Sequence, residues 1–194
     1  LVMLVCRRLT GFEGWEKKDI DSILRLSQSP GSRPYLRLKK GLLVYKVYEQ
    51  LIFTTRARKK VAFCHQLEVP GQVYIKETGE LVSSRVLPRE QYRADSQDIL
   101  LDWDKVKGPF LVRSRLPGDR FAAFPASGST KLKEYFINKK IPWEEREQTP
   151  LLVSAEGRIY ALLGLAVDHE ARVSPQTERI LVIKRERISG IEQY

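Results

Sequence analysis

The cationic side chains with the most suggestive spacing in this 194-residue chain lie between residues 113 and 146. Guanidinium and ammonium groups bind phosphate through charge and through their N–H donors. Arg113 and Arg115 are two residues apart, a spacing that places both on one face of a strand, where each could contact a phosphate or a guanine edge. The candidate phosphate contacts are Arg113, Arg115, Arg120, Lys131, Lys133, Lys139, Lys140 and Arg146. This block therefore indicates a surface that binds phosphates.

The net charge supports a polyanionic partner. The chain has 34 Lys and Arg residues against 24 Asp and Glu residues, a formal net charge of +10. From Lys105 to Lys140, nine basic residues oppose two acidic ones. This balance favours nucleic acid, then an anionic membrane or an acidic protein. Taken alone, the charged run is equally well explained as a solvated face.

A turn and a helix would position these cations. Pro117-Gly118 predicts a tight turn, and Asp119 is expected to hydrogen-bond its backbone in preference to acting as a catalyst. Leu132, Tyr135 and Phe136 have the spacing of one helix face, which should pack on a small sheet.

The start of that helix offers a further phosphate-binding feature. Ser129 and Thr130 are expected to cap the helix, and the amide hydrogens of a capped N-terminus suit an anion. Trp143, which follows Pro142 at the start of the next predicted helix, is expected in the core in preference to a base-stacking surface.

Catalytic patterns are missing from the sequence. It has no P-loop, no Gly-x-Ser-x-Gly and no dinucleotide-binding glycine motif, and His65 and His169 are solitary. Cys6 and Cys64 lack the spacing of a zinc site, and Cys64 is expected to be a small buried residue. We therefore predict binding without chemistry in this chain, with no catalytic residue and no metal ligand.

The remaining pattern predicts an α+β fold: N-terminal helices plus antiparallel strands, then a small α+β C-terminal domain with a few strands and two short helices. Helices are expected over residues 1–9 and 19–27. An antiparallel meander should follow over residues 35–38, 42–48, 51–55, 67–69, 73–75 and 81–87. After a boundary near Lys107, strands are expected over 110–115, 151–153, 158–163 and 180–184, with helices from about Thr130 and from Pro142.

The chain has no apolar run of the roughly 20 residues that span a bilayer. We therefore expect a soluble protein with no membrane partner, and the sparing use of cysteine fits the reducing cytoplasm. The first residues have the pattern of the middle of an apolar element, so the chain is expected to be a fragment.

Several motifs resemble one family. Residues 112–121 and 131–142, with Arg146, residues 150–152 and Gly164, are similar in order and spacing to the C-terminal domain of bacterial tRNA(Ile)-lysidine synthases. The resemblance is specific over about 110–184, and residues 19–26 and 41–49 resemble the family's middle region. It implies a middle substrate (tRNA)-binding region over residues 1–107 and a basic C-terminal tRNA-binding domain over residues 108–194.

The resemblance also implies a function. Enzymes of this family use ATP to adenylate the wobble cytidine of tRNA(Ile) with a CAU anticodon and then join lysine to it. Their catalysis belongs to an N-terminal ATP-pyrophosphatase domain with a Ser-Gly-Gly-x-Asp-Ser loop, which this chain lacks. The chain is thus expected to grip the tRNA body and acceptor stem, and the resemblance together with the charge makes the eight candidate phosphate contacts named above the expected RNA contacts. ATP and Mg²⁺ are expected only for the full-length enzyme, and the missing domain is an expected partner.

An alternative function is a non-catalytic interaction module that docks a separately encoded catalytic subunit. Specific binding of tRNA would favour the first hypothesis. A neighbouring reading frame that encodes the Ser-Gly-Gly-x-Asp-Ser loop would distinguish a split enzyme from a truncated one. A homodimer is left open.

Overall fold

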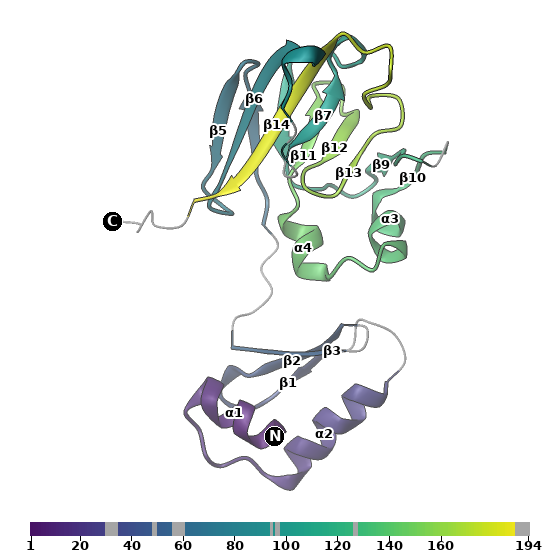
Figure 1. The fold of residues 1–194 in the computed structure, drawn as a ribbon. Helices are drawn as coiled ribbons and strands as arrows, with labels where there is room; N and C mark the ends of the chain where they lie inside the picture. The colour runs from purple at the N-terminus through teal and green to yellow at the C-terminus, as the bar shows by residue number, and fades with distance from the viewer. Residues whose placement is uncertain are drawn as a thin grey trace. The chain divides into compact units, whose positions relative to one another are not determined.

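In the computed structural model, the described residues are 1–29, 35–47, 50–55, 61–93, 95, 98–125 and 128–188. The chain divides into two compact units, Leu1–Lys59 and Lys60–Tyr194 (Figure 1). Both units combine helices with antiparallel sheets. The predicted α+β class is confirmed.

The first unit packs two helices on a small sheet. Its elements are α1 (Val2–Thr10), α2 (Lys17–Gln28), β1 (Tyr35–Arg37), β2 (Leu43–Val47) and β3 (Gln50–Thr54), with the strands in the order β1-β2-β3. Alternate residues leading into and along β2 face opposite sides of the sheet, so Leu42 and Val44 join Cys6 and Ile23 in one core. The two predicted helices and the first three strands of the meander are confirmed.

The second unit is built on two antiparallel sheets. One sheet has the order β13-β12-β11-β8-β4 and the other β5-β6-β14-β7. Their strands are β4 (Cys64–Leu67), β5 (Gly71–Ile75), β6 (Glu80–Pro88), β7 (Ile99–Asp102), β8 (Phe110–Arg113), β11 (Leu151–Ser154), β12 (Ile159–Leu162), β13 (Ala166–Val167) and β14 (Arg179–Arg187). Val112 and Leu152 of the first sheet share a buried core with Val82, Leu101 and Leu181 of the second. The two sheets therefore pack face to face.

Two short helices follow a small hairpin on the five-stranded sheet. The hairpin pairs β9 (Arg120–Phe121) with β10 (Thr130–Lys131), and the helices are α3 (Leu132–Asn138) and α4 (Trp143–Gln148). Leu132 and Phe136 are buried against Leu151 and Val153 of β11, as the helical spacing predicted. None of the helices in the described ranges is long and apolar enough to cross a membrane.

Strands β4, β5 and β6 do not continue the first meander, contrary to the sequence-based expectation. β4 pairs with β8, and β6 pairs along its length with β14, nearly a hundred residues later. Residues 61–107 therefore share sheets with residues 108–188. The division between compact units falls at Lys59 and Lys60 instead of near Lys107, because hydrogen-bonded partners of β8 and β14 come from before residue 107.

Candidate nucleic-acid interface

Asp119 organises the turn that follows β8. Its Oδ2 accepts a hydrogen bond from the Leu116 N–H at 2.7 Å, and its carbonyl accepts from the Leu132 N–H at 2.8 Å. Gly118 has a φ of 90°, a conformation that L side chains rarely adopt. The predicted role of Asp119 in stabilising this turn is confirmed, and its backbone carbonyl also fixes the start of α3.

Arg113 lies at the end of β8 with 7% of its surface exposed. Its Nη1 and Nη2 donate to the two Asp119 carboxylate oxygens at 2.9 and 2.8 Å, and Nη1 also donates to the Ser114 carbonyl at 3.0 Å. Through these hydrogen bonds the Arg113 guanidinium stabilises the turn. The expected open strand face carrying both Arg113 and Arg115 is therefore not formed.

Arg115 lies beyond the end of β8 and is partly buried. Its guanidinium contacts Glu147, and the Arg115 Nε lies 2.7 Å from Glu147 Oε1. The Glu147 side chain is only 2% exposed, so this ion pair is largely shielded from solvent. Arg115 therefore fixes α4 beside the Pro117-Gly118 turn.

Arg146 and Arg120 also contact carbonyl oxygens within the unit. Arg146 is 8% exposed, and its Nε donates to the Ile141 carbonyl at 2.6 Å, which supports the connection between α3 and α4. Arg120 is exposed, and its Nη2 donates to the Ser129 carbonyl at 2.6 Å across the hairpin.

Four of the predicted contacts are exposed lysines at the two ends of α3. Lys131 and Lys133 line a pocket of about 520 Å³ together with Pro117, Trp143 and Glu147. Lys139 and Lys140 follow the other end of α3, about 10 Å away along the helix axis. The structure thus brings Lys131, Lys133 and the turn together and separates them from the second lysine pair. Trp143 is half-buried at this pocket, so it is not wholly in the core.

The predicted helix cap is wrong. Thr130 and Lys131 pair with Phe121 and Arg120 in the β9–β10 hairpin, so α3 begins only at Leu132. Lys131 occupies the N-cap position without a side-chain hydrogen bond to the helix. Strand pairing keeps Thr130 extended, which a local capping pattern does not reveal.

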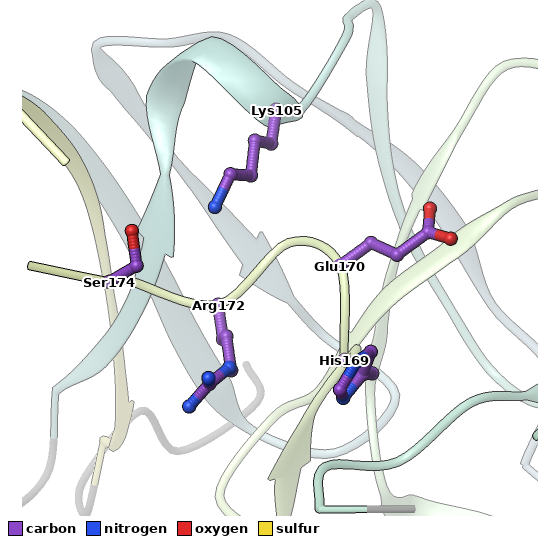
Figure 2. A pocket seen from close by; sticks show the side chains of 5 residues that line it. All are labelled: Lys105, His169, Glu170, Arg172 and Ser174. Atoms are coloured by element: carbon purple, nitrogen blue, oxygen red, sulfur yellow. The ribbon is translucent and has the colours of Figure 1, made fainter. Parts of the chain in front are cut away.

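A second pocket of about 530 Å³ is lined by Lys105, His169, Glu170, Arg172 and Ser174 (Figure 2). None of these was a predicted site residue, and Lys105 is far from the others in sequence. They meet because an isolated bridge pairs Arg172 with Leu101 of β7. The pocket could not be predicted from the sequence, because it depends on that long-range pairing.

The carboxylate beside this pocket is ionised. Burial raises the pKa of Asp102, but hydrogen bonds from Thr177 and Lys105 more than offset that effect and hold the pKa below its usual value. The Lys105 Nζ lies 3.1 Å from Asp102 Oδ2. The charge of Asp102 thus compensates that of Lys105.

The cysteines and acids of the described ranges do not gather into a cluster of three or more metal-ligating side chains. Cys6 is buried, whereas Cys64 is exposed on β4, contrary to the expectation of a small buried residue. Cys64 is the first residue of β4, where its side chain alternates with the buried Phe63.

Comparison with known proteins identifies relatives over most of the chain. Residues 110–184 match the family described as TilS substrate C-terminal domain. The chain is 30% identical over 175 residues to the tRNA(Ile)-lysidine synthase of Caldanaerobacter subterraneus subsp. tengcongensis, which covers 89% of this chain and 37% of the relative. It is 34% identical over 154 residues to that of Geobacillus kaustophilus, covering 75% of this chain and 32% of the relative.

A solved structure gives the same similarity. The crystal structure of a TILS C-terminal domain superposes with a TM-score of 0.54 at 29% identity, over 66% of this chain and 99% of that chain. This share of the chain is larger than residues 110–184 alone. The chain spans just over a third of the length of the first two curated relatives that it matches.

Proposed function

We propose that this chain, whose residues 110–184 belong to the TilS substrate C-terminal domain family, is the tRNA-binding part of a tRNA(Ile)-lysidine synthase. The whole enzyme would join lysine to the wobble cytidine of tRNA(Ile) with a CAU anticodon. A catalytic N-terminal domain would use ATP and Mg²⁺ for this ligation. This chain would hold the tRNA body and acceptor stem while that domain acts on the anticodon.

The observation that carries the proposal is the pair of exposed lysines, Lys131 and Lys133, beside a turn that is fixed by a buried ion pair. An A-form stem presents phosphates and 2′-hydroxyls on a wide, shallow minor groove. Lysine side chains suit contacts to such a backbone, because an ammonium group can bind a phosphate whatever the base sequence is.

The cationic residues divide by role within this proposal. Lys131, Lys133, Lys139, Lys140 and Arg120 are exposed and would contact RNA directly. Arg113, Arg115 and Arg146 would act by positioning, since Asp119, Glu147 and the Ile141 carbonyl already accept their hydrogen bonds. Recognition would be mainly of shape and backbone, and binding would weaken as salt concentration rises.

Fluorescence anisotropy tests the proposal. The chain is titrated with CAU-bearing tRNA(Ile), elongator tRNA(Met) and duplex DNA at two salt concentrations. We expect a preference for tRNA that persists at the higher salt. Equal binding to all three that disappears with salt would contradict the proposal, because it would reflect only the net charge of +10.

The double variant Lys131→Gln, Lys133→Gln tests the site itself. We expect tRNA affinity to fall about tenfold or more and the salt slope to decrease by about 0.7 to 0.9 for each phosphate that is no longer neutralised. The matched control is Lys76→Gln with Arg187→Gln, which removes the same charge from exposed positions in the turn after β5 and at the end of β14. An equal decrease in affinity in the control would exclude a localised site at Lys131 and Lys133.

A further inference from the structure

Arg172 has no carboxylate partner among the described residues, unlike several other arginines of this unit. Neither an ion pair nor a guanidinium hydrogen bond is formed by Arg172 within the described ranges. By contrast, Arg113, Arg115, Arg158, Arg179 and Arg185 each contact an Asp or Glu. None of the described residues therefore occupies the N–H donors of Arg172.

The guanidinium of Arg172 is nevertheless held in place. Its central carbon lies 4.1 Å from the centroid of the Phe124 ring, and that ring stacks on His169 with centroids 6.0 Å apart and an interplanar angle of 17°. Phe124 is 47% exposed, so this stack lies at the surface of the unit. Stacking on an aromatic face orients a guanidinium and reduces the entropy lost on binding.

The backbone beneath Arg172 is also fixed. Arg172 forms an isolated antiparallel bridge with Leu101 of β7, and the Ala171 carbonyl accepts a hydrogen bond from the Asp102 N–H at 2.8 Å. Ala171 itself is fully buried. The cation is thus presented by a segment anchored to the four-stranded sheet.

The charges around the pocket favour an anion. Lys105 extends toward the space between Ser174 and Arg172, whereas the Glu170 carboxylate extends away from it (Figure 2). Glu170 shares Arg158 with Asp168, since the Arg158 Nη2 lies 2.7 Å from Glu170 Oε2 and 3.0 Å from Asp168 Oδ1. The residues that line the pocket therefore carry two cations, Lys105 and Arg172, against the one carboxylate of Glu170.

His169 lines the pocket with its ring, which stacks on Phe124. Its Nδ1 atom is buried and has no hydrogen-bond partner among the described residues, so a ligand in the pocket would not contact that atom.

We infer that the pocket between Lys105, Arg172 and Ser174 is a phosphate-binding site. Arg172 supplies paired N–H donors, Lys105 an ammonium group that is also paired with Asp102, and Ser174 a hydroxyl at the rim. A volume of about 530 Å³ accommodates a phosphate with the sugar attached to it. The assignment of that phosphate to a tRNA backbone rests on the proposed function, whereas the phosphate chemistry does not.

The NMR signal of the Arg172 side-chain Nε–H tests the chemistry directly. The whole chain is titrated with inorganic phosphate and, separately, with CAU-bearing tRNA(Ile), each at constant ionic strength, and Arg172→Gln assigns the signal. A shift with both ligands supports a general phosphate site, and a shift with tRNA alone supports a backbone site. A signal that moves with neither ligand would overturn the inference.

Binding to tRNA provides the second test. We expect Arg172→Gln to weaken tRNA binding about five- to tenfold and to lower the salt slope by about 1. Phe124→Leu keeps the net charge but removes the ring that holds the guanidinium, and should weaken binding about two- to fivefold. The control Lys76→Gln removes one exposed charge elsewhere in the unit, and all variants should keep the parent melting temperature within about 2 °C.

The two proposals can fail separately. If Arg172→Gln binds tRNA like Lys76→Gln while the Lys131 and Lys133 variant is impaired, the phosphate site is contradicted and the proposed function stands. If the parent chain shows no preference for tRNA, the proposed function fails, and the Arg172 signal in inorganic phosphate still decides whether the pocket binds phosphate.

Discussion

Arg113 and Asp119 have side chains that are only 9% and 10% exposed, and their charges meet in two parallel hydrogen bonds. Removing one member of a buried pair leaves an uncompensated charge, which is far more costly than removing an exposed pair. The same two residues also hold the turn that presents Lys131. Arg113, which the sequence predicted to contact RNA, therefore stabilises the fold at this position.

The variant Arg113→Ala should lower the free energy of unfolding by about 3–5 kcal/mol, because Asp119 would remain buried without its partner. Urea unfolding at pH 7 measures this value. The exposed control Lys133→Ala should change it by less than about 0.5 kcal/mol. A decrease below about 1 kcal/mol in Arg113→Ala would show that the pair is not buried as described.

Helix α3 follows the turn and carries the exposed lysines of the proposed RNA-binding surface. It has only seven residues, too few for a helix that is stable by itself. Leu132 and Phe136 attach it to β11, while Lys133, on another face of α3, and Lys131, at its N-cap, remain exposed. The apolar side of the helix thus determines where the basic side lies.

Phe136→Ala should cost about 3–5 kcal/mol of stability, since the ring is fully buried and its removal leaves a cavity. Lys139→Ala, at the exposed C-terminal end of the helix, is the matched control and should be close to neutral. Denaturant unfolding compares the two variants. If both had small effects, the proposed attachment of α3 through Phe136 would be wrong.

At the scale of the molecule, the sheets of the second unit combine segments from both sides of residue 107. β8 has β4 as one neighbour, and β14 lies between β6 and β7. Neither sheet can be completed by residues 108–194. The stable piece of the chain is therefore expected to begin near residue 60.

Residues 60–194 expressed alone should fold, with dispersed amide NMR signals and one cooperative unfolding transition. Residues 108–194 should not, because β8 and β14 would expose unpaired edges and the core shared by the two sheets would be incomplete. Folding of the shorter fragment would instead favour the boundary near Lys107 expected from the sequence.

The sequence by itself determined the features that depend on near neighbours. Helical spacing identified α1, α2 and the buried face of α3, and Pro117-Gly118-Asp119 identified the turn, because these depend on interactions within a few residues. The order of the motifs in the second half also identified the family.

Only the tertiary structure decided the strand partners and the state of each cation. Arg115 meets Glu147 across 32 residues, β6 meets β14 across nearly a hundred, and the bridge that places Arg172 beside Lys105 depends on β7. The sequence around one member of such a pair does not indicate which residue is the other member. Burial then decides which charges must be paired within the fold and which remain available to phosphate.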